Sequence, residues 1–169
     1  MTAKTLLFFV VLTAAGASAV APTGMPPVLL SGQHSAMCNV AVGDVFPAVS
    51  GAPMKPGDVA TVVAVVNGAG WMSRQLVVDL TNDVAQPLGG KGVAAVLLDA
   101  RPGGKPADPG VQRFTLTAEA QSQLGTGRWP RVYLLDSNGR ILWFDIEWGI
   151  SSRRDLHSAL GAVLADPQP

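Results

Sequence analysis

A single cysteine, Cys38, is the only sulfur nucleophile among the 169 residues. An intramolecular disulfide needs two cysteines, so the chain cannot form one or cycle a dithiol by itself. Two interpretations of Cys38 stay open. It is either a reactive thiol that works with a partner's thiol or a peroxide, or a small apolar residue packed at the edge of the fold, which is the commoner role of a lone cysteine.

His34, Met37 and Cys38 form the run His-x-x-Met-Cys, with Met25 upstream and Met54 downstream. Thiolate, thioether and imidazole ligands together would suit Cu(I). The run lies in a Pro- and Gly-rich stretch without hydrophobic periodicity, which is a poor frame for a metal centre. We therefore expect no metal and no other cofactor.

Two carboxylates, Asp145 and Glu147, alternate with apolar residues near the carboxyl end. On a strand this alternation places both on one face. Such a pair can act as acid and base, but at a strand end it more commonly forms a solvated face. We expect the solvated face, with Arg153-Arg154 nearby to offset its charge. The sequence has no Ser-His-Asp order, phosphate-binding loop or metal-spaced histidine pair, and His157 is expected to face solvent from a helix.

The charge and composition exclude several classes of partner. The chain has 12 basic and 12 acidic side chains, and its longest basic cluster is Arg153-Arg154. This balance argues against a nucleic-acid partner or a polybasic membrane surface. With 48% hydrophobic residues, the chain has enough apolar material for a packed core despite its 19 glycines and 13 prolines. The length fits one domain.

Residues 1–19 have the pattern of a secretory signal peptide. Lys4 precedes the apolar run Thr5–Ala15, and Ala17-Ser18-Ala19 is a small-residue cleavage site. The apolar run is shorter than the ~20 residues that span a bilayer. We expect an exported protein, periplasmic or secreted, with no membrane span after cleavage.

The mature chain divides into a flexible Pro- and Gly-rich leader at 20–37 and one domain at 38–165. Continuous apolar and β-branched runs predict buried strands, typical of a sheet covered on both faces. The predicted strands are 61–66, 93–98, 131–135 and 141–146, the last two joined by Asn138-Gly139, a hairpin signal. The predicted helices are 72–85, ended by Pro87, then 117–124, capped by Thr117, and 152–164, opened by Ser152 and Asp155. We expect a central sheet sandwiched between the two longer helices.

Four segments, in this order, resemble those of the thioredoxin fold and, more narrowly, of the redoxin family of thiol-specific-antioxidant and thioredoxin-like proteins. They are the entry segment Val42–Pro47, the strand and turn Thr61–Trp71, the cis-proline strand Trp129–Asp136 and the hairpin Ser137–Leu142. The resemblance covers about residues 40–165. It implies an α/β, thioredoxin-like fold, with a central mixed β-sheet flanked by helices and a cis peptide bond before Pro130.

The sequence departs from this family at the active-site turn. Redox-active members carry Cys-x-x-Cys directly after the tryptophan, where a helix N-terminus activates the thiolate. Here Trp71 is followed by Met72, Ser73, Arg74 and Gln75, and no peroxidatic cysteine stands in the turn. A thioether has no ionisable proton and cannot form a mixed disulfide. The chain therefore resembles thiol-disulfide oxidoreductases and peroxiredoxins without their active-site cysteines, and no catalytic residue is assigned.

The resemblance also implies a binding surface, because relatives pair the cis-proline turn with a partner's extended backbone. Here Pro130 is flanked by Trp129 and Trp71, which would form an apolar docking patch for a protein or peptide. The plainer interpretation is that both tryptophans pack the loops. The expected function is a binding or scaffold role, and the alternative is an oxidoreductase or antioxidant role for Cys38 with a partner thiol. The sequence specifies no oligomeric state.

Overall fold

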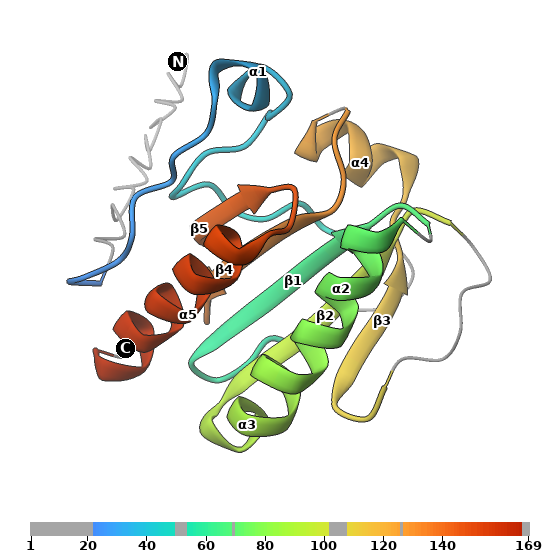
Figure 1. The fold of residues 1–169 in the computed structure, drawn as a ribbon. Helices are drawn as coiled ribbons and strands as arrows, with labels where there is room; N and C mark the ends of the chain where they lie inside the picture. The colour runs from blue at the N-terminus through green and yellow to red at the C-terminus, as the bar shows by residue number, and fades with distance from the viewer. Residues whose placement is uncertain (1–21, 50–53, 69, 102–107, 126, 167–169) are drawn as a thin grey trace, which may run out of the picture.

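A five-stranded sheet with helices on both faces forms the centre of the computed structural model, which describes residues 22–49, 54–68, 70–101, 108–125 and 127–166 (Figure 1). The strand order is β3-β2-β1-β4-β5. The strands are β1 (Ala60–Val66), β2 (Val93–Asp99), β3 (Val111–Thr115), β4 (Arg131–Asp136) and β5 (Ile141–Ile146). β1 pairs in parallel with β2 and antiparallel with β4, so the sheet is mixed, as expected.

The alternation of side chains along the strands builds two core clusters, one on each face. All seven residues of β1 are buried, which explains why every one of them except Thr61 is apolar. Val62 and Ala64 belong to the first cluster, whereas Val63 and Val65 belong to the second. α2 (Trp71–Asp79) and α5 (Ile150–Ala165) cover the first cluster. α4 (Ala118–Leu124) covers the second together with apolar residues of the amino-terminal segment.

The expected sandwich of the sheet between the two longer helices is therefore wrong. Leu76 of α2 and Leu160 of α5 contact the same core cluster, and in Figure 1 both helices lie on one side of the sheet. Ion pairs from Arg153 to Asp79 and Asp83 join them. Strands that are apolar on both faces show only that both faces are covered, and do not say which element covers which face.

The helix predicted at 72–85 begins one residue earlier and continues through Pro87. α2 runs into π-helical turns at η1 (Leu80–Ala85), then α3 (Gln86–Leu88) and the 3₁₀ turn η2 (Gly89–Lys91). A proline ring clashes with the i−4 carbonyl of an α-helix, but in π-helical turns the bonding pattern moves to i−5. Pro87 follows these wider turns directly, so it does not end the helical segment.

The ends of the two later helices differ in how well their caps were predicted. The Thr117 hydroxyl accepts a 3.2 Å hydrogen bond from Ala120 N, which confirms it as the cap of α4. The expected capping box of Ser152 and Asp155 is wrong, because α5 begins at Ile150 with Gly149 as its N-cap. Ser152 lies inside the helix, and its hydroxyl donates to the carbonyl oxygen of Glu147.

The amino-terminal residues 22–49 lie along the edge of the sheet beside β5 (Figure 1). They contain the short helix α1 (Gly32–Ser35), and Val28 packs against both core clusters. Val45 forms an isolated bridge with Arg140. The described part of the expected leader thus contacts the domain, and the expected signal peptide lies outside the described residues. No helix among the described residues is long and apolar enough to cross a membrane.

Candidate functional site

The turn where the resembled family holds its cysteines lies between β1 and α2. α2 begins at Trp71, and its N-cap, Gly70, provides no side-chain hydrogen bond. The Trp71 side chain is 66% exposed, although tryptophan is usually well buried. Met72 is half-buried and packs against the first core cluster. An apolar thioether therefore stands where an exchange reaction would need a thiolate.

Gln75, which replaces the second cysteine of the family pattern, is exposed, but its side chain bonds to a buried carboxylate. Its Nε2 donates a 3.0 Å hydrogen bond to Oδ1 of Asp79, a residue only 4% exposed. The other carboxylate oxygen, Oδ2, accepts a 2.8 Å bond from the Trp148 indole, and Nη1 of Arg153 lies 3.3 Å from Oδ1. The last residue of α2 thus joins this helix to α5 through one carboxylate, and this network was not predicted.

The Trp129–Pro130 peptide bond is cis, as the resemblance implied. Arg131, the next residue, pairs with Val65 of β1 on one side and Ile146 of β5 on the other. The cis-proline loop therefore leaves the sheet at the same end as the turn before α2. Glu147 N donates a 2.8 Å hydrogen bond to Pro130 O, which attaches this loop to the end of β5.

Arg131 organises the loop from the inside, although sequence reasoning did not single it out. It is 1% exposed, and its guanidinium donates to three backbone carbonyls, those of Leu124 (2.7 Å), Met37 (3.0 Å) and Arg128 (3.1 Å). Its Cζ atom lies 5.2 Å from the centroid of the Trp129 ring, in a cation–π arrangement. The only signal in the sequence was an arginine at the start of an otherwise apolar strand.

The two tryptophans at this end of the sheet consequently play different roles. Trp129 is half-buried, packs against the second core cluster and lies against Arg131. Pro130 is buried. Trp71, on the other side, is mostly exposed. Of the three predicted docking residues, Trp71 offers the accessible apolar surface, while Trp129 and Pro130 support the loop behind it.

The carboxylates at the end of β5 do not have the expected partners. Glu147 has a φ of 67°, so the alternation with Asp145 breaks at the strand end. Arg128 forms an ion pair with Glu147, and His34 Nε2 lies 3.8 Å from its Oε2. Arg153-Arg154, expected to offset this face, instead bind Asp79, Asp83 and Asp155. Burial raises the pKa of Asp145, opposed by hydrogen bonds from Ser152 and Ile146 N.

Cys38 follows α1 in a turn and is half-buried against the second core cluster. It lines a cavity of about 260 Å³ with Val28, Leu30 and Phe144. Burial raises the pKa of its thiol above the ordinary value of 9.0, and the Arg131 charge opposes this shift. The thiol is therefore protonated at neutral pH. Its backbone is nonetheless close to the cis-proline loop, because Met37 O is bound by Arg131.

The methionines near the His-x-x-Met-Cys run, which were considered as soft-metal ligands and not expected to bind a metal, are not brought together. Met25 packs against the first core cluster and Met54 against the second. Met37 presses against the loop before Pro130, since a Cβ atom built on Gly127 would lie 3.0 Å from its sulfur. Within the ranges that the structure describes, no group of three or more His, Cys, Asp or Glu residues is placed to hold a metal ion.

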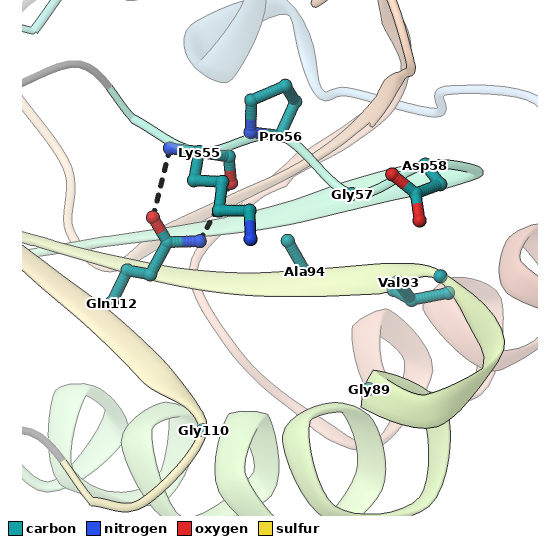
Figure 2. A pocket seen from close by; sticks show the side chains of 10 residues that line it. Lys55, Pro56, Gly57, Asp58, Gly89, Val93, Ala94, Gly110 and Gln112 are labelled. Atoms are coloured by element: carbon teal, nitrogen blue, oxygen red, sulfur yellow. Dashed lines mark hydrogen bonds between the residues drawn. The ribbon is translucent and has the colours of Figure 1, made fainter.

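A second cavity of about 260 Å³ lies at the opposite end of the sheet, where β2 begins (Figure 2). Lys55 N donates to Gln112 Oε1 (2.9 Å), and Gln112 Nε2 donates to Lys55 O (2.7 Å). A Cβ atom at Gly57 would lie 2.1 Å from Ala60 O, so only glycine fits this corner. The amide of Gln112 is thus used to hold the segment before β1 against the edge strand β3.

Comparisons with known proteins agree on the fold. No protein-family model and no curated protein matches the sequence. Among solved structures, a protein assigned as thiol:disulfide interchange protein DsbE from Chlorobium tepidum matches with a TM-score of 0.58 at 18% identity, over 74% of this chain and 99% of the other. A thiol:disulfide interchange protein from Bacteroides sp. matches with a TM-score of 0.53 at 14% identity, over 73% of this chain and 91% of the other. The chain therefore has the thioredoxin-like fold, in a variant that lacks the Cys-x-x-Cys pair.

Proposed function

We propose that this chain is an exported thioredoxin-like protein without dithiol chemistry, and that it binds an extended segment of a partner protein beside Trp71 and the cis-proline loop. The observation that carries the proposal is the 66% exposed Trp71 at the start of a helix that has no thiol. Export rests on the pattern of residues 1–19.

The sheet register supports a peptide site at this place. Val65 is opposite Arg131, so the turn before α2 and the loop around Pro130 leave neighbouring strands. Arg131 and the Glu147 amide hold this loop through buried or backbone hydrogen bonds, which makes it a rigid surface. A rigid loop loses little conformational freedom when a partner binds. An exposed tryptophan beside such a surface is typical of an interface hot spot.

Selection of linear peptides from a random displayed library, followed by fluorescence anisotropy on the synthesised peptides, tests the proposal. Trp71→Ala is expected to weaken binding at least about 30-fold, because a hot-spot tryptophan contributes ~2 kcal/mol or more. Val78→Ala is the matched control, since Val78 is also an exposed apolar residue of α2. Selection of no peptide above background, or equal affinities of both variants, would contradict the proposed site.

A second candidate function uses Cys38 and is favoured by its position on a cavity close to the cis-proline loop. The Cys38 thiolate would attack a partner disulfide, forming a mixed disulfide and releasing the partner's other sulfur as a thiolate. The raised pKa opposes this function. Alkylation by iodoacetamide between pH 6 and 10 is expected to be slower than that of free glutathione at each pH. Faster alkylation than glutathione at pH 7 would favour the Cys38 function instead.

A further inference from the structure

Three arginines lie at the end of the sheet that holds the candidate docking surface. Arg74 lies in the first turn of α2, Arg101 follows β2, and Arg128 precedes Trp129, and all three are exposed. Arg101 reaches across to the turn before α2, because a Cβ atom built on Gly68 would lie 2.6 Å from its Cζ. These cations come from separate elements that end at the same end of the sheet.

Among the residues that the structure describes, three carboxylates near this end are already engaged or face elsewhere. Asp99 is buried and forms an ion pair with Arg113. Glu147 is bound by Arg128, with His34 3.8 Å away. Glu119 opens α4, which covers the opposite face of the sheet from α2. Within the described residues no carboxylate is paired with Arg101, so this end of the sheet carries positive charge near Trp71, although the chain as a whole has no net charge.

The spacing of these cations suits an extended chain. Arg101 follows β2, whereas Arg128 reaches Glu147 at the end of β5, three strand positions away in the sheet. Three strand spacings amount to about 14 Å, and an extended segment rises about 3.3 Å per residue. A segment of roughly five residues laid across the strand ends would thus reach both guanidinium groups.

From this arrangement we infer that the partner segment is acidic: an extended peptide whose carboxylates are recognised by Arg101 and Arg128 on either side of Trp71. This inference rests on the proposed function and narrows its partner class. Glu147 then acts as an internal competitor, because its carboxylate occupies the Arg128 guanidinium until a carboxylate of the peptide replaces it.

Three fluorescein-labelled seven-residue peptides test the inference by anisotropy at low salt. One alternates valine with aspartate, the second has asparagine and the third has lysine in place of aspartate. The aspartate peptide is expected to bind most tightly, with the advantage falling in 0.5 M NaCl as the charges are screened. Arg101→Gln and Arg128→Gln are each expected to weaken its binding about two- to five-fold, as exposed ion pairs do.

Two further variants make the test specific. Glu147→Gln is expected to strengthen binding of the aspartate peptide, since it frees Arg128 from its internal partner. Lys91→Gln removes one exposed positive charge before β2, at the far end of the sheet, and is expected to leave the affinity unchanged. Thermal melts of all variants verify that they remain folded.

The outcomes separate this inference from the proposed function. Equal binding of all three peptides, with loss on Trp71→Ala, would overturn the acidic preference and leave the peptide site standing. Binding of none of them, when library selection also yields no peptide, would overturn both. Tighter binding of a labelled oligothymidylate than of the aspartate peptide would overturn the inference in favour of a nucleic-acid ligand.

Discussion

At the residue scale, the replacement of the two family cysteines has different consequences at the two positions. Met72 fills apolar space at the core, and a thiol there would lose this contact. The Gln75 amide donates one hydrogen bond to the buried carboxylate of Asp79, and the Trp148 indole donates another. Both substituted positions thus support α2, and the exposed apolar surface at the start of this helix is the ring of Trp71.

Asp79 is expected to be important for stability. Asp79→Ala removes the acceptor of the buried Trp148 indole, which leaves that donor without its partner, and also the acceptor of the exposed Gln75 amide. Loss of such an acceptor costs ~1–3 kcal/mol. Urea denaturation checks this value, with Asp58→Ala as control, because Asp58 is exposed at the other end of the sheet. A change below ~0.5 kcal/mol, the range of neutral surface substitutions, would contradict the role of the network.

Asp145 is expected to make stability depend on pH. Burial raises its pKa in the folded state, so the native protein binds a proton more tightly than the unfolded chain does. Its contribution is therefore most favourable at low pH and falls as the pH rises through the folded pKa. Asp145→Asn is expected to raise Tm at pH 7 and to lose this advantage near pH 3. Equal shifts of Tm at both pH values would contradict the assignment.

At the scale of elements, the loop before β4 and the amino-terminal segment fit closely together. Gly125 has a φ of 105°, and a Cβ atom there would lie 2.1 Å from Met37 O. Asn39 Nδ2 donates to Ser122 O, and Arg131 binds Met37 O, so both ends of the loop are attached to residues 37–39. The amino-terminal segment therefore takes part in shaping the cis-proline loop.

Gly125→Ala is expected to destabilise the protein by about 1–3 kcal/mol, because both the positive φ and the backbone contact oppose a methyl group. Gly161→Ala is the control, since a Cβ atom in the middle of α5 meets nothing within 4 Å. There alanine is expected to stabilise by up to ~1 kcal/mol through helix propensity. Chemical denaturation measures both variants, and equal effects of the two would contradict the close contact at Gly125.

The elements that sequence reasoning predicted are those with a strong internal pattern. β1 is buried at every position and β2 at six of its seven positions, and Thr117 is a helix cap with a direct side-chain bond. β3 was missed because it is a short edge strand of half-buried residues. The π-helical turns of η1 were also missed, because their buried apolar residues follow the spacing expected for one face of an α-helix.

For the candidate site, the sequence predicted local features and missed those that depend on the tertiary fold. The positions of Trp71 and the cis bond before Pro130 followed from the family resemblance. The three carbonyls that converge on Arg131 come from residues 37, 124 and 128, which are distant in the sequence or lie in a loop. The prediction that Arg153 lies near Glu147 was also wrong because it depends on the tertiary fold. Arg153 of α5 forms ion pairs with Asp79 and Asp83 instead.

At the scale of the whole molecule, the scaffold keeps the thioredoxin-like arrangement while the chemistry at its usual position is gone. The N-terminus of α2 still lies at the same end of the sheet as the cis-proline loop, and such a helix end stabilises a thiolate. The combined change Met72→Cys and Gln75→Cys is therefore expected to create dithiol activity that the wild type lacks. Insulin reduction measured by turbidity with dithiothreitol checks this. If the double variant folds but reduces insulin no faster than the wild type does, then the absence of the two cysteines is not sufficient to explain the lack of thiol-disulfide exchange. That result would contradict this account.

The central claim, that a partner segment binds beside Trp71 and the cis-proline loop, is tested most directly by the indole N–H resonances of the four tryptophans in a ¹⁵N NMR titration with a library-selected peptide. We predict large shifts for Trp71, smaller shifts for Trp129, and unchanged positions for the buried Trp143 and Trp148. Saturable peptide binding that leaves the Trp71 resonance in place would contradict the account.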